Sequence, residues 1–120
     1  MAGTADHPIA VVPVSQRVRV RFAGHTIADT VRALSLREAS YPPVLYIRRD
    51  DVDMSLLVRS EHKSRCPYKG EASYYSIRAG GRSAENAIWS YEKPLADMAE
   101  IAGLMAFYPN RVDAIEETPA

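Results

Sequence analysis

The sequence predicts a mainly β fold: a single compact domain of short antiparallel strands with one or two short helices. Residues 17–22 alternate arginine with an apolar side chain, which is the period-two pattern of a strand with one solvent face and one core face. Glycine and proline interrupt the chain at short intervals, and only residues 95–101 show a helical period. The 120 residues suffice for one hydrophobic core and are too few for two.

The first half of the chain is expected to form an N-terminal arm followed by four strands. The arm comprises residues 1–16, in which two prolines make residues 9–14 suited to a sheet edge. Gly24 lies in the first turn, and Pro42 and Pro43 precede the fourth strand because neither can donate a ladder hydrogen bond. The four strands are expected at residues 17–22, 25–30, 33–38 and 44–48.

The second half of the chain is expected to form a hairpin and short helical segments. Residues 54–57 predict one helical turn capped by a preceding aspartate. The polar residues 61–70 predict a loop, and Gly80 and Gly81 predict the turn of a hairpin. The hairpin strands are expected at residues 71–78 and 84–91, a helix at 95–101, a last strand at 104–108 and a fraying acidic tail from 111 onward.

The composition of the chain argues against several classes of partner. Fifteen basic and fifteen acidic residues cancel, so bulk charge would draw the protein neither to nucleic acid nor to an anionic membrane. No apolar run approaches the roughly 20 residues that span a bilayer, and the first residues lack the order of a secretory signal. A single cysteine permits no internal disulfide. We therefore expect a cytoplasmic protein, with its domain at residues 17–115 and a tail at 116–120.

Polar and aromatic side chains gather in residues 66–91, which hold the only cysteine, the only tryptophan and four of the seven tyrosines. Such a mixture is typical of a pocket for a small, anionic molecule. The expected ligand-binding residues are Tyr46, Arg48, Cys66, Lys69, Tyr74, Trp89 and Tyr91. If the pocket is catalytic, the candidates are Lys69, Tyr74 and Cys66, but no motif defines a reaction. Whether the protein is an enzyme stays open.

Each of these side chains also has a structural interpretation. Cys66 is either a buried, inert thiol or a group that faces a ligand, and Lys69 lies either on the surface or in the pocket. Trp89 and Tyr91 share a strand face that either packs in the core or stacks on a flat ligand. Arg48 either binds an anion or forms a surface ion pair.

Acidic residues offer one candidate metal site. Asp51 and Asp53 would face the same way on a strand and could then share a cation, but a solvated turn and helix cap is the better interpretation. The three histidines are scattered and show no zinc-ligand spacing. We expect neither a metal nor a cofactor.

Several separated motifs identify a family resemblance. They are Y-P-P-V-L-Y-I-R-R-D-D-V at residues 41–52, C-P-Y-K-G at 66–70, W-S-Y-E at 89–92 and F-Y-P at 107–109. In this order they resemble family 427 of the domains of unknown function, a group of small bacterial and fungal proteins, over roughly residues 17 to 115. The resemblance implies a compact β-rich fold of the β-tent type and an undefined activity, although the family is sometimes labelled nucleotidyltransferase-like.

Three further hypotheses compete with the pocket. The first is a non-enzymatic interaction module, in which exposed strand edges pair with a second copy or another protein. The second is metal-dependent nucleotidyl transfer, which only the family label implies. The third is nucleic-acid binding through Arg17, Arg19 and Arg21 on one strand face, against which the zero net charge argues.

Overall fold

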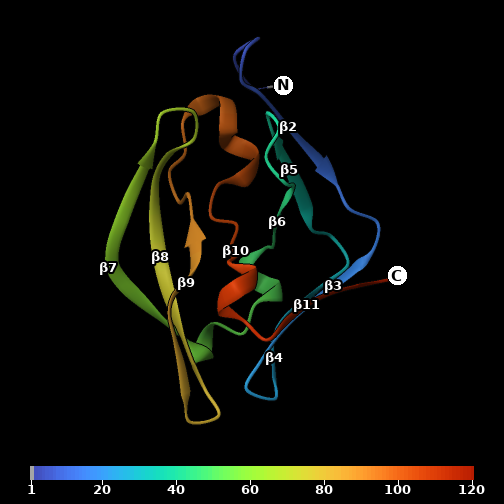
Figure 1. The fold of residues 1–120 in the computed structure, drawn as a ribbon, viewed down its shortest axis with the longest axis vertical. Coiled ribbons are helices and arrows are strands. Elements are labelled where there is room, and N and C mark those ends of the chain that lie inside the picture. Colours follow the sequence, from blue (N-terminus) through green and yellow to red (C-terminus); the bar gives the residue numbers. More distant parts are fainter. Residues whose placement is uncertain (1) are drawn as a thin grey trace.

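Three antiparallel sheets make up the fold in the computed structural model, which describes residues 2–120 (Figure 1). The first sheet has the order β1 (Ala2–Gly3), β2 (Pro8–Pro13), β5 (Leu34–Glu38) and β6 (Val44–Tyr46). The second has the order β10 (Ala106–Phe107), β9 (Arg82–Ser90), β8 (Gly70–Ala79) and β7 (Leu57–Cys66). The third has the order β11 (Ala114–Thr118), β3 (Arg17–Phe22) and β4 (His25–Thr30). The predicted mainly β, single-domain fold is confirmed.

The helical segments are all short 3-10 turns. They are η1 (Arg49–Asp51), η2 (Met54–Leu56), η3 (Ala96–Ile101) and η4 (Pro109–Arg111). The Asp53 side chain accepts a hydrogen bond from the Ser55 amide, which confirms an aspartate cap before residue 54. No helix within residues 2–120 has the length and apolar character needed to cross a membrane.

The strand β3 has the two faces that its sequence predicts. Val18, Val20 and Phe22 are buried, and the arginines between them are half-buried. Arg17 donates two hydrogen bonds to Asp29, at 2.6 and 2.8 Å. The arginine face of β3 is therefore partly neutralised by a carboxylate of the neighbouring strand.

The acidic tail does not fray, and that prediction is wrong. Residues 114–118 form β11, which pairs with β3 from Ala114 opposite Arg21 to Thr118 opposite Arg17. Ile115 packs against the core, and Glu116 lies 3.9 Å from Arg19. The tail is held because its apolar side chain and its negative charge both find complements on β3.

The expected loop at residues 61–70 is also wrong, because β7 continues to Cys66 and only residues 67–69 form the turn. Lys63, Ser64 and Arg65 pair with Ser73, Ala72 and Glu71. The edge strand β7 is mostly exposed and therefore carries no alternation of apolar and polar side chains by which it could be recognised. The hairpin of β8 and β9 is confirmed, with its turn at residues 80 and 81.

The fourth and last predicted strands are shorter than expected. The strand β6 ends at Tyr46, after which Ile47 forms an isolated bridge to Met105. The strand β10 comprises two residues. This bridge connects the segment after β6, in the first sheet, to the residue that precedes β10, in the second sheet.

The core consists of two clusters of buried side chains. One cluster includes Val20, Ile47, Tyr75 and Ile77, from strands of the second and third sheets and the segment after β6. The other includes Leu36, Tyr46, Tyr74, Tyr91 and Met98, from strands of the first and second sheets, the segment after β9, and η3. The second cluster is rich in tyrosine, and its three buried tyrosines line the cavity described next.

Candidate functional site

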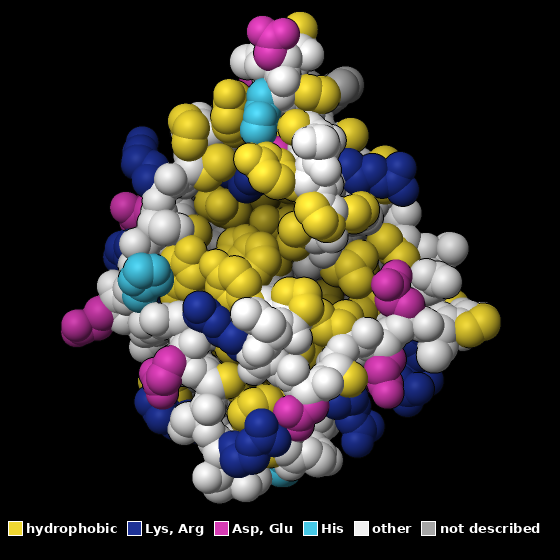
Figure 2. Space-filling view, viewed as in Figure 1, with side chains coloured by type: hydrophobic (Ala, Val, Ile, Leu, Met, Phe, Trp, Pro, Cys, Tyr) yellow, Lys and Arg dark blue, Asp and Glu magenta, His cyan; other side chains and the backbone are white. Residues whose placement is uncertain are grey.

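A cavity of about 280 Å³ lies between the first and second sheets. Figure 2 shows that one face of the molecule is hollowed and that hydrophobic side chains form much of the hollow. The side chains that line the cavity are Leu36, Glu38, Tyr41, Val44, Tyr46, Lys69, Tyr74, Trp89, Tyr91 and Tyr108. Five of the seven predicted ligand-binding residues are among them: Tyr46, Lys69, Tyr74, Trp89 and Tyr91.

Aromatic rings form one wall of the cavity. Trp89 meets Tyr46 edge-on, with ring centroids 6.4 Å apart, and its indole N–H donates a 3.1 Å hydrogen bond to the Tyr46 hydroxyl. The Tyr108 ring lies 4.5 Å from Trp89 at an angle of 46°. The Tyr74 hydroxyl shares a 2.8 Å hydrogen bond with Ser64 of β7. These contacts hold the rings in fixed orientations and leave their remaining surfaces to the cavity.

A buried ion pair occupies another wall. Lys69 is 7% exposed and pairs through Nζ with the Glu38 carboxylate. Glu38 also lies 2.7 Å from the His7 ring nitrogen Nε2, and the His7 ring stacks on Tyr68 at 4.1 Å. The Lys69 Nζ lies 5.9 Å from the centre of the Tyr91 ring. The ammonium is thus held between a carboxylate and an aromatic face.

The turn at residues 67–69 carries Lys69, and its backbone packs closely against the backbone of residues 94–95. The Leu95 amide donates a 2.9 Å hydrogen bond to the Lys69 carbonyl. Gly70 follows at φ +113°, and a Cβ there would lie 3.3 Å from the Leu95 nitrogen and 3.4 Å from the Pro94 Cα. Glycine is required at this position by both its φ angle and the lack of space.

The local environment keeps the site carboxylate charged and the phenols neutral. Burial acts to raise the pKa of Glu38, but hydrogen bonds from Lys69 and His7 outweigh it, so this pKa lies below its ordinary value. Burial raises the pKa of Tyr46 and Tyr91 far above the ordinary phenol value. Burial and the neighbouring Tyr74 hydroxyl raise the pKa of Tyr108 to about 12. At neutral pH these three tyrosines are hydrogen-bonding groups and not bases.

Two predicted ligand-binding residues do not line this cavity. Arg48 is exposed, because β6 ends at Tyr46 and the alternation that would place both side chains on one face is broken there. Cys66 is half-buried at the end of β7 and packs against the tyrosine-rich core cluster.

Sequence reasoning missed Glu38 and Tyr108. Glu38 is 31 residues from Lys69, and no local pattern links the two positions. Tyr108 lies in the F-Y-P motif at residues 107–109, so the family motif was the signal that could have found it. Both enter the cavity only because the first and second sheets face each other.

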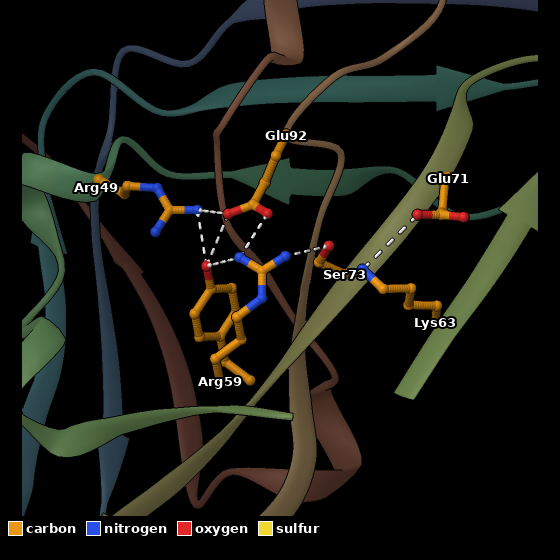
Figure 3. A network of polar contacts seen from close by, with 7 residues as sticks. Arg49, Arg59, Lys63, Glu71, Ser73 and Glu92 are labelled. Atoms are coloured by element: carbon orange, nitrogen blue, oxygen red, sulfur yellow. Dashed lines mark hydrogen bonds and ion pairs between the residues drawn. The ribbon is translucent and has the colours of Figure 1, made fainter. Parts of the chain in front are cut away.

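A second polar network holds the segment that leaves β9 (Figure 3). Arg49 and Arg59 lie 2.6 and 2.7 Å from the two oxygens of the Glu92 carboxylate, and the Tyr75 hydroxyl donates to the same carboxylate at 2.7 Å. Burial acts to raise the pKa of Glu92, but the hydrogen bonds from Tyr75 and Arg59 lower it below its ordinary value. Because Tyr91 directly precedes Glu92, this network anchors one wall of the cavity.

The acidic residues that were candidate metal ligands have other partners. Asp51 accepts hydrogen bonds from Thr30 at 2.7 Å and from Arg32 at 2.9 and 3.2 Å, and Asp53 caps η2. Within residues 2–120, no group of three or more His, Cys, Asp and Glu side chains is placed to hold a metal ion.

Comparison with known proteins agrees with the motifs quoted from the sequence. No curated protein matches the chain significantly. A family model described as "Domain of unknown function (DUF427)" matches residues 10–118, which is nearly the whole chain. With its C-P-Y-K-G turn carrying Lys69 into the cavity and its W-S-Y segment forming the aromatic wall, the chain belongs to the DUF427 family.

Proposed function

We propose that the cavity binds a small molecule that carries a flat ring and an anionic oxygen group. The observation that supports this is the convergence of one buried lysine, one indole and several neutral phenols on a single cavity. These side chains come from strands of two different sheets and from three connecting segments. A volume of about 280 Å³ lies near the lower end of ligand pockets, so the ligand is small.

Hydrogen-bond donors in the cavity favour an oxygen acceptor on the ligand. Lys69 has three N–H groups, and within residues 2–120 its ammonium hydrogen-bonds only to Glu38. The Tyr46 hydroxyl accepts from Trp89 and keeps its own proton to donate. A carboxylate on the ligand would share Lys69 with Glu38, so we expect modest affinity and not the tight binding of an unpaired cation.

The aromatic wall favours a planar ligand. Trp89 and Tyr108 contact each other at an angle and both line the cavity, so a ring can contact the surfaces that they leave free. The raised pKa values of Tyr46 and Tyr91 favour binding over proton abstraction for these side chains at neutral pH. Lys69 and Tyr74, which were candidate catalytic residues, have binding roles in this proposal.

Trp89 provides a direct assay, because it is the only tryptophan and lines the cavity. Benzoate is expected to change the fluorescence of Trp89 in a saturable way, and the neutral isostere benzamide is expected to bind more weakly. Benzoate at 100 times its Kd should also stabilise the fold by about 2.7 kcal/mol. Absence of any saturable response to both compounds would contradict the proposal.

A matched pair of tyrosine variants tests whether the response arises in this cavity. Neither the Tyr91 nor the Tyr68 hydroxyl makes a hydrogen bond within residues 2–120, and only Tyr91 lines the cavity. Loss of one hydrogen bond to a charged ligand costs about 1.5–3 kcal/mol, so Tyr91→Phe should weaken benzoate binding by roughly tenfold or more. Tyr68→Phe should bind as the natural protein does, and an equal loss in both variants would count against this site.

A further inference from the structure

A second and larger cavity adjoins the first. Its volume is about 720 Å³, and it lies between strands of the first sheet and the strands β3 and β11 of the third. Its apolar lining includes Val12, Val20, Leu45, Ile47, Phe107 and Ile115. None of these side chains takes part in the ion pair or the aromatic wall of the first cavity.

The two cavities share a wall. Val44 and Trp89 line both of them, so the two cavities meet at these residues. Along β5 the cavities lie on opposite faces, because Leu36 and Glu38 line the first and Ser35 and Arg37 line the second. The indole N–H of Trp89 is used by Tyr46, at the side of the first cavity. A molecule that occupies both cavities therefore has to cross from one to the other beside Trp89 and Val44.

The cavities differ in chemistry in a complementary way. The first has Lys69, Glu38 and tyrosine hydroxyls in its lining. The charged residues that line the second are Arg37 and Glu117, which are both exposed and of opposite sign. A large apolar surface beside a polar site favours a ligand that removes both from water.

We propose that the natural ligand is amphipathic, with its anionic ring group in the first cavity and an aliphatic chain in the second. This inference rests on the function proposed above and specifies the class of ligand. A ligand without a chain would occupy about 280 Å³ and leave an adjoining apolar cavity of about 720 Å³ to solvent. The shared boundary at Val44 and Trp89 is the reason to assign both cavities to one molecule rather than the second to a separate partner.

A series of para-alkylbenzoates tests the chain. Benzoate, para-butylbenzoate and para-hexylbenzoate would be titrated below their aggregation concentrations, with Trp89 fluorescence as the signal. Each methylene that enters an apolar cavity should tighten binding by about fourfold. Equal affinity across the series, with benzoate still bound, would overturn the inference and leave the proposed function intact. No binding of any member would overturn both.

Two valine variants separate the second cavity from general hydrophobic binding. Val12 lines the second cavity and belongs to neither buried core cluster, so Val12→Phe narrows that cavity at little expense to the core. Val58 is 45% exposed on β7 and lines neither cavity. Val12→Phe should remove the gain with chain length while benzoate binds unchanged, and Val58→Phe should alter neither. If affinity in Val12→Phe still increases with chain length as in the natural protein, the assignment of the alkyl chain to this cavity is overturned. A gel-filtration result showing that the longer ligands bind only at an interface between two copies would also overturn it.

Discussion

The ion pair between Glu38 and Lys69 makes a sharp prediction about stability and its dependence on pH. The variant Glu38→Gln removes the negative charge and keeps the shape of the side chain. It leaves the Lys69 ammonium, whose side chain is only 9% exposed, without a charged partner inside the protein. Removing one partner of a fully buried pair costs about 3–5 kcal/mol. Because the Glu38 side chain is 16% exposed and glutamine can still accept one hydrogen bond, we expect about 2 kcal/mol.

The sign of the pH dependence follows from the lowered pKa of Glu38. A carboxyl whose folded pKa lies below its unfolded value of about 4.3 stabilises the protein above that value. The contribution is lost as the pH falls through the folded pKa, when Glu38 itself becomes neutral. The difference between the natural protein and Glu38→Gln is therefore full at about pH 7 and closes well below about pH 4.

Urea unfolding followed by Trp89 fluorescence measures this difference, and thermal unfolding should show a fall in Tm of about 8 °C for a domain of this size. Glu71→Gln is the matched control, since the pair of Glu71 with Lys63 spans 3.7 Å and both side chains are about half exposed (Figure 3). Such a surface pair contributes about 0–1 kcal/mol. The reasoning is refuted if Glu38→Gln costs no more than Glu71→Gln, or if its cost persists unchanged in acid.

Two further predictions concern the backbone of the site and the tail. Gly70→Ala should destabilise the protein by about 2 kcal/mol and weaken benzoate binding, because the added Cβ meets the Leu95 nitrogen at 3.3 Å. The control Gly81→Ala, at φ +74° with no atom within 4 Å of the added Cβ, should cost about 1 kcal/mol and leave binding unchanged. Equal losses of stability in thermal unfolding would contradict the steric argument. Truncation after Asp113 removes β11 and should abolish cooperative unfolding, since β11 pairs with β3 and Ile115 packs against the core. Removal of residues 119–120 alone is the control and should leave Tm unchanged. A stable protein that lacks β11 would show that the tail is dispensable.

Local patterns in the sequence are sufficient where one side of an element meets the core and the other meets water. The alternation of Arg17 to Phe22 predicts β3 because burial alternates with it, and Gly80 and Gly81 predict the hairpin turn because both adopt positive φ angles. The same logic failed for β7. Most of its residues are exposed, so no pattern of burial was available in the sequence.

The candidate site was predicted in part by residue type. Aromatic side chains and a lysine next to a glycine indicated a pocket, and Lys69, Tyr74, Trp89 and Tyr91 do share one. The prediction included Arg48 because it assumed a longer strand than β6, whose end is set by the bridge from Ile47 to Met105. A pairing over that distance in the chain leaves no local signal.

The sequence by itself determined the mainly β fold, the hairpin of β8 and β9, the family and most of the aromatic wall, because each depends on residue type and on spacing within a strand or turn. Only the tertiary structure decided that Glu38 neutralises Lys69, that Tyr108 completes the wall and that an apolar cavity adjoins the polar one across Trp89. These features arise where separate sheets meet. Their side chains are brought together by the packing of the sheets against one another, which nearest neighbours in the chain do not encode.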